Sequence, residues 1–181
     1  MIAFKKFGVK IIGFTESNIH FTKYRIKTVD LDGILFSIYS PEGIGIPKSV
    51  ERFFDADHWD TKHTKIKPLD RNTKKPNPSI LQKIISDIGG KKANTIYIGD
   101  KLDRDVYMAN EADVISVYAK YGHIITGEKY ELLRDVTHWT DEEVEREKEF
   151  KKKINSIDIQ PKYTIKRYDE ILDIFKFMRF D

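Results

Sequence analysis

Short β-rich runs alternate with helical segments through the first two thirds of the chain, and this order constrains the fold more than any other feature. A sheet whose strands are separated by helices is parallel and has helices on both of its faces. The sequence therefore predicts an α/β class with a Rossmann-like parallel sheet. The predicted strands are residues 9–14, 34–39, 95–98 and 114–118, and the predicted helices are residues 18–29, 47–54, 78–88 and 103–111.

Two neighbouring segments differ most clearly in their hydrophobic periodicity. Residues 78–88 place isoleucine and leucine side chains on one helical stripe and stop at Gly89-Gly90, which is typical of an amphipathic helix. Residues 55–78 lack hydrophobic periodicity and contain three prolines, which favours an irregular loop. Long loops of this kind in compact domains are often functional.

The 181 residues suffice for one domain with an appendage. We predict an α/β core over residues 1–125 and a C-terminal extension over residues 126–181 that packs on this core. In the extension, the charged segment 141–153 is expected to be a solvated helix, 163–165 a short strand, and 168–178 a helix docked on the core.

Composition excludes several function classes. The chain has no cysteine, so disulfide scaffolds, thiolate zinc sites and cysteine nucleophiles are excluded. Net charge is only +3, and the excess of four positive charges over residues 58–75 is explained by a solvated loop beside an anionic-substrate site. A phosphate-rich macromolecule is the alternative for that loop, but we expect no nucleic-acid partner. No apolar run spans a bilayer and no secretory signal is recognised, so we expect no membrane association and a cytoplasmic location.

Three residues with complementary chemistry fall at one edge of the predicted sheet. Thr15 follows the first strand, Asp100 follows the strand 95–98, and Lys75 lies in the loop before the amphipathic helix. Ligands of parallel α/β sheets bind beyond the carboxyl ends of the strands. A hydroxyl and a lysine can hold phosphoryl oxygens, and a carboxylate can hold a divalent metal ion. The sequence therefore predicts a site for a phosphate group together with a divalent metal ion.

These residues resemble the haloacid dehalogenase superfamily of phosphatases and related phosphoryl-transfer enzymes. The resemblance covers about residues 8–122 and carries three of the family's four ordered signatures. They are a hydrophobic strand ending in threonine (Ile11-Ile12-Gly13-Phe14-Thr15), Lys-Pro-x-Pro opening a helix (Lys75 to Pro78), and Gly-Asp-x-x-x-x-Asp after a strand (Gly99 to Asp105).

The resemblance implies Mg²⁺-dependent hydrolysis of a small phosphorylated substrate through an aspartyl-phosphate. Lys75 and Asp105 are implied as catalytic residues, Thr15 and Lys75 as the binding residues for the substrate phosphate, and Asp100 as the Mg²⁺ ligand. Asp105 is implied as a supporting carboxylate, either near the metal ion or bound to Lys75.

The chain departs from the family at the nucleophile. The family's Asp-x-Asp motif precedes the strand that ends in threonine, and residues 1–8 contain no aspartate. Asp30-Leu31-Asp32 copies its letters, but it follows Thr15 and precedes a β-rich run, so we interpret it as a helix-to-strand turn. We therefore expect an incomplete core that lacks the first strand and the cap, completed by an N-terminal segment or by a homo-oligomer partner. The alternative function is a non-catalytic remnant that binds a phosphorylated ligand or a protein partner.

Overall fold

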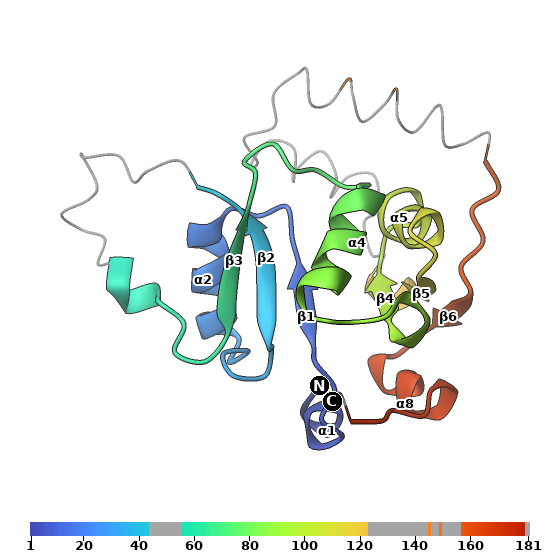
Figure 1. The fold of residues 1–181 in the computed structure, drawn as a ribbon, viewed down its shortest axis with the longest axis horizontal. Helices are drawn as coiled ribbons and strands as arrows, with labels where there is room; N and C mark the ends of the chain where they lie inside the picture. The colour runs from blue at the N-terminus through green and yellow to red at the C-terminus, as the bar shows by residue number, and fades with distance from the viewer. Residues whose placement is uncertain (44–55, 123–144, 146–148, 150–156, 180–181) are drawn as a thin grey trace. The chain divides into compact units, whose positions relative to one another are not determined.

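The computed structural model describes residues 1–43, 56–122, 145, 149 and 157–179, and it divides into two compact units (Figure 1). The first unit comprises Met1–Lys74 and Phe175–Asp181. The second unit comprises Lys75–Ile174. Each unit is described by itself below. The predicted boundary between residues 125 and 126 stays a prediction.

The first unit contains a three-stranded parallel sheet in the order β1-β2-β3 (Figure 1). Its register places Ile38 beside both Gly13 and Ile66. The approach at Gly13 is close, because a Cβ there would lie 2.7 Å from the Ile38 side chain. The strands are β1 Ile12–Phe14, β2 Ser37–Pro41 and β3 Lys65–Leu69.

Helix α2, Ile19–Thr28, packs on this sheet and begins where the sequence predicts. Asn18 caps it, since the side-chain oxygen accepts the backbone N–H of Phe21 at 3.2 Å. Ile26 of α2 packs with Leu35 and Ile38 in a buried apolar cluster. The described part of the unit also contains helix α1 Ile2–Lys6 and the 3₁₀ turn η1 Ala56–Trp59.

Strand β3 corrects the prediction of an irregular loop over residues 55–78. The strand reads Lys-Ile-Lys-Pro-Leu, so its lysines and its proline conceal the apolar alternation. Lysine and proline are typical of an edge strand, whose outer side needs no ladder partner. β3 lies at the edge of its sheet, which explains why this composition is tolerated.

The second unit contains another three-stranded parallel sheet, in the order β4-β5-β6. Gly99 at the end of β4 lies beside Tyr118, and Val117 lies beside Tyr163. The predicted short strand 163–165 is confirmed, and it pairs with β5. The strands are β4 Ile96–Gly99, β5 Ile115–Ala119 and β6 Tyr163–Ile165.

Helix α4, Pro78–Asp87, is the amphipathic helix predicted from the isoleucine stripe. Asn77 caps it by accepting the N–H of Ile80 at 3.0 Å, and proline occupies its first turn. Gly89 follows with a φ of +71°, a left-handed conformation that favours glycine. The other helical elements among the described residues of this unit are η2 Lys92–Asn94, η3 Leu102–Val106, α5 Tyr107–Glu111, η4 Lys120–Gly122, η5 Tyr168–Glu170 and α8 Ile171–Ile174.

The last predicted helix is shorter than expected. Residues 168–178 were predicted as one helix, but helical structure ends at Ile174. The following segment returns to the first unit, where Phe177 packs edge-on against Phe4 with ring centroids 4.8 Å apart. Phe177 therefore packs against another aromatic ring although it is not part of a helix. The predicted helices 47–54 and 141–153 lie outside the residues whose structure is described.

The predicted α/β class with Rossmann-like parallel strands is confirmed. Each described sheet is parallel, and helical segments separate most of its strands along the chain. Among the described residues, no helix has the length and apolar character needed to cross a lipid bilayer.

Candidate active site

The candidate site is built around a widened helical turn that follows β4. The carbonyl of Lys101 accepts two backbone N–H groups, from Asp105 at 2.9 Å and from Val106 at 3.1 Å. The second bond spans five residues, which defines the π-helical turn η3. Such turns are rare and often occur at functional sites. This turn carries the carboxylate of Asp105 back toward β4.

Gly99 makes room for that carboxylate. A Cβ built on Gly99 would lie 2.2 Å from the Cβ of Asp105, closer than any real side chain could be. The residue that ends β4 therefore has to be glycine if Asp105 is to fold beneath it. The N–H of Lys101 then donates to Oδ2 of Asp105 at 3.3 Å.

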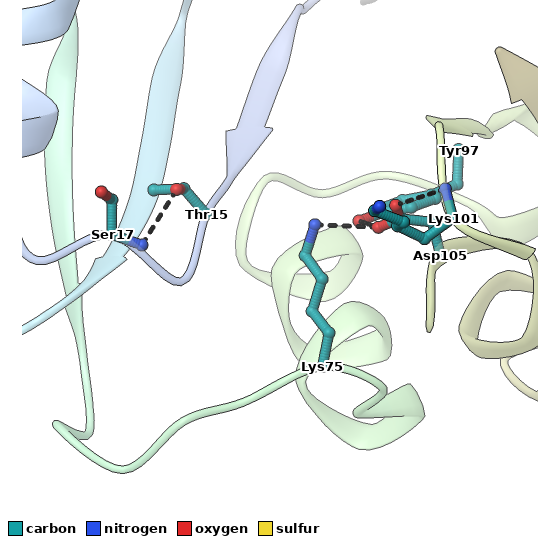
Figure 2. Close-up of polar contacts among 6 residues, drawn as sticks. All are labelled: Thr15, Ser17, Lys75, Tyr97, Lys101 and Asp105. Atoms are coloured by element: carbon teal, nitrogen blue, oxygen red, sulfur yellow. Dashed lines mark hydrogen bonds and ion pairs between the residues drawn. The ribbon is translucent and has the colours of Figure 1, made fainter. Parts of the chain in front are cut away.

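Lys75 and Asp105 form a largely buried ion pair (Figure 2). The ammonium nitrogen of Lys75 lies 2.9 Å from Oδ1 of Asp105, and the two side chains are 14% and 7% exposed. The hydroxyl of Tyr97 donates to the same oxygen at 3.0 Å. The Lys75 ammonium also lies 5.6 Å from the centre of the Tyr97 ring, which is the range of a cation–π interaction.

The start of α4 determines where Lys75 stands. Lys75 is joined to Pro76 by a cis peptide bond, and Asn77 and Pro78 then cap and open the helix. The buried face of α4 anchors this segment to its unit. Lys75 is thus presented from the N-terminal end of a packed helix.

Asp100 lies directly after β4 with a different environment. Within the described part of the chain, its carboxylate takes part in no hydrogen bond or ion pair. Gly122 packs against it, because a Cβ on Gly122 would lie 2.7 Å from the Cβ of Asp100 and 3.5 Å from Oδ2. Burial raises the pKa of Tyr121 and the negative charge of Asp100 raises it further, so the phenol also lies within the field of this carboxylate.

The environment of Asp100 fits a magnesium ligand. Mg²⁺ binds hard oxygen ligands and is usually held by one or two carboxylates, several waters and the phosphate of its substrate. An uncommitted carboxylate at the end of a strand, with glycine backbone beside it, meets that requirement. The described residues contain no cluster of three or more acidic or histidine side chains suited to a metal ion.

Thr15 belongs to the first unit and directly follows β1. Its N–H donates to the carbonyl of Tyr39 at 3.0 Å, and its hydroxyl oxygen accepts the N–H of Ser17 at 3.1 Å (Figure 2). The hydroxyl of Ser17 accepts in turn from Arg25 at 2.8 Å. Of the predicted site residues, Lys75, Asp100 and Asp105 therefore lie in one unit and Thr15 in the other.

Asp30 and Asp32 occupy the turn between α2 and β2, as the sequence predicts. Asp30 is exposed with a φ of +53°. The carboxylate of Asp32 accepts the backbone N–H groups of Lys62, His63 and Thr64 at 2.7, 3.0 and 2.8 Å. Burial raises the pKa of Asp32, but these N–H groups together with the Thr64 hydroxyl lower it to about 2. Asp32 is thus a loop anchor before β3.

Sequence reasoning missed two residues of the site. Tyr97 lies within a short β-rich run, where an aromatic side chain is ordinarily a packing residue. Gly122 lies beyond the last matched signature. The signal for Tyr97 is its position two residues before Gly99, because alternate strand residues share one face.

Comparison with known proteins finds similarity in this region of the chain. Residues 72–133 match a family model described as "HAD-hyrolase-like". A stretch of 48 residues is 38% identical to the glyceraldehyde 3-phosphate phosphatase of Methanopyrus kandleri, covering 26% of this chain and 21% of that protein. The matched part of the chain thus spans about a fifth of the length of this curated relative.

Two solved structures are similar at low scores. The 2-haloacid dehalogenase of Pseudomonas syringae has a TM-score of 0.38 and 11% identity, over 82% of this chain and 50% of that one. Bs-TpNPPase has a TM-score of 0.34 and 13% identity, over 98% of this chain and 71% of that one. Scores below 0.5 carry no argument, so the family resemblance rests on the sequence. The segment that the family model matches contains Lys75, Asp100 and Asp105 in the order of the predicted signatures, and this segment is similar to haloacid dehalogenase-like hydrolases.

Proposed function

We propose that this chain carries part of the active site of a phosphatase-type hydrolase that acts on small phosphorylated substrates. The observation that carries the proposal is the buried Lys75–Asp105 pair together with Asp100, which directly follows β4 and whose carboxylate forms no hydrogen bond or ion pair with the described residues. A phosphate group needs a cation, which Lys75 provides, and its metal ion needs a carboxylate, which Asp100 provides.

Each residue then has a distinct role. Lys75 offsets the negative charge of the phosphoryl group as a compact cation. Asp105 holds Lys75 in place, and Asp100 holds Mg²⁺. When bound, Mg²⁺ supplies charge stabilisation to the phosphoryl oxygens. The role of Thr15 remains the one predicted from sequence, a hydroxyl donor to a phosphoryl oxygen.

The attacking carboxylate comes from a segment other than the turn at Asp30 and Asp32. In the proposed reaction a carboxylate oxygen bonds to phosphorus while the bond to the leaving oxygen breaks, and water then releases phosphate. β1 and β4 are edge strands of the described sheets, so either can accept one more strand. That strand would come from an N-terminal segment or from a second copy of the chain.

Hydrolysis of p-nitrophenyl phosphate with and without Mg²⁺ tests the proposal. In an assembly that holds the attacking carboxylate, we expect turnover that requires Mg²⁺ and that falls about 100-fold in Lys75→Met and in Asp100→Asn, because each change removes a charge from the site. Lys74→Met is the matched control, since it removes the neighbouring, exposed lysine. Equal loss in Lys74→Met and Lys75→Met would contradict the assignment.

A non-catalytic phosphate-binding protein is the second candidate, favoured by the commitment of Asp32 to three backbone N–H groups. It predicts no turnover, but binding of inorganic phosphate that Lys75→Met weakens and Lys74→Met does not. Phosphorus-31 NMR titration measures this binding. If the protein shows no turnover and no phosphate binding that depends on Lys75, both candidates are refuted.

A further inference from the structure

Asp105 has more hydrogen-bond donors than an ion pair with Lys75 requires. Its buried carboxylate accepts the Lys75 ammonium, the Tyr97 hydroxyl and the backbone N–H of Lys101. Lys75 and Tyr97 both donate to the same oxygen, Oδ1, at 2.9 and 3.0 Å (Figure 2). The negative charge on this oxygen is therefore shared between a cation and a neutral hydroxyl.

This sharing matters when the lysine meets an anion. If the Lys75 ammonium turned toward a phosphoryl oxygen, Oδ1 of Asp105 would lose its cation while the residue remains only 5% exposed. A buried carboxylate oxygen without a donor is costly. The Tyr97 hydroxyl lowers that cost, because it stays on Oδ1 after the lysine has turned away.

The backbone gives Tyr97 this place. Tyr97 and Gly99 are two residues apart in β4, so they share one face of the strand. Gly99 leaves the space that Asp105 fills, and Tyr97 presents its hydroxyl to the carboxylate in that space. The ring of Tyr97 also keeps the Lys75 ammonium within 5.6 Å of its centre.

We propose that Tyr97 is a positioning residue that keeps Asp105 partnered and so lets Lys75 be shared between Asp105 and a bound phosphate monoester. The inference rests on the proposed function, because it concerns the same lysine. Tyr97 acts through Asp105 and Lys75 and does not itself touch the substrate.

Protection of Lys75 from an acylating reagent by inorganic phosphate tests this inference. Peptide mass spectrometry follows acylation of Lys75 as phosphate is added to the full chain. In Tyr97→Phe the ring remains but the hydroxyl is lost, and we expect half-protection to need about tenfold more phosphate, the effect of one hydrogen bond to a charged group. Tyr118→Phe is the matched control on the neighbouring strand, where no described hydrogen bond involves the hydroxyl.

The outcomes separate the inference from the proposed function. If phosphate fails to protect Lys75 in the unaltered chain, the proposed function is wrong. If phosphate protects equally in the unaltered chain and in Tyr97→Phe, the proposed function stands and the role of Tyr97 is refuted. A tenfold shift in Tyr97→Phe with none in Tyr118→Phe supports the role.

A double variant covers failure of Tyr97→Phe to fold. Asp105→Asn removes the buried charge that needs the hydroxyl, so Tyr97→Phe is expected to be tolerated in that background. Phosphate protection should then be the same with and without Tyr97→Phe, because Tyr97 acts only through the carboxylate. A difference between the two would mean that Tyr97 acts independently of Asp105 and would overturn the inference.

Discussion

Replacing Asp32 by asparagine is expected to destabilise the first unit and to leave phosphoryl chemistry unchanged. Oδ1 of Asp32 accepts the N–H groups of His63 and Thr64, and Oδ2 accepts that of Lys62. Asparagine retains one oxygen acceptor but turns an NH₂ group toward the remaining N–H. The loop before β3 therefore loses a charge-assisted hydrogen bond, and a backbone N–H donor is left facing the NH₂ donor of asparagine.

The lowered pKa of Asp32 gives the size of the expected loss in folding stability. A fall from the ordinary 3.8 to about 2 corresponds to at most about 2.4 kcal/mol of folding stability, since one pKa unit is worth about 1.36 kcal/mol. The side chain is only partly buried, so solvent screening reduces this to about 1 kcal/mol. The stabilisation is fully present above the unfolded-state pKa near 4 and is lost as pH falls through about 2.

Urea unfolding followed by tryptophan fluorescence measures the effect. Trp59 lies in the first unit, so a Trp139→Phe background makes it the reporter of that unit. Asp30→Asn is the matched control because it removes the same charge from an exposed side chain whose left-handed backbone asparagine tolerates. We expect a loss of about 1 kcal/mol for Asp32→Asn at pH 7, little for Asp30→Asn, and convergence of Asp32→Asn with the unaltered chain toward pH 2.

Two results would refute this reasoning. Equal stability of both variants would show that the three N–H contacts contribute nothing. Robust Mg²⁺-dependent turnover that Asp30→Asn abolishes without loss of stability would reinstate Asp30-Leu31-Asp32 as the nucleophile motif and would remove the need for another segment.

Three further changes have defined outcomes. Lys75→Met leaves the buried Asp105 with neutral donors only, and it should lower stability by about 2 kcal/mol in thermal unfolding. Gly99→Ala forces a Cβ into Asp105 and should cost about 2–3 kcal/mol, measured by chemical denaturation. Asn77→Ala removes the cap on the Ile80 N–H and should cost about 1 kcal/mol, seen as faster amide exchange in the first turn of α4.

The most predictable elements were those with one strong local signal. The stripe of residues 78–88 predicted α4 to within one residue, because cap, proline and stop glycine agree with the periodicity. β3 was missed because its lysines and proline are explained only by its edge position, which the local sequence does not contain. Residues 175–178 continue a helical pattern, yet the helix ends at Ile174 and Phe177 contacts Phe4, which is remote in sequence.

The candidate site likewise contains residues that the local sequence predicts and contacts that only the folded chain reveals. Lys75, Asp100 and Asp105 are predicted from sequence because signature order and residue type are visible along the chain, and the structure places all three in the second unit. The contact of Tyr97 with Asp105 depends on the π-helical turn, whose extra residue reverses the side chain toward β4. No spacing rule for regular helices predicts that reversal. The contacts of Asp32 join residues about thirty positions apart, so only the folded chain reveals them.

The position of Asp32 along the strands decides what the attacking carboxylate has to be. Asp32 precedes β2 and binds the N–H groups just before β3, so it lies at the amino ends of parallel strands. Thr15 follows the carboxyl end of β1 in the same sheet. The five residues of β2 separate these two edges by about 13 Å, at about 3.3 Å per residue. A carboxylate that attacks a phosphoryl group held at the Thr15 edge must therefore enter from the carboxyl ends of the strands, which the Asp32 side chain cannot reach.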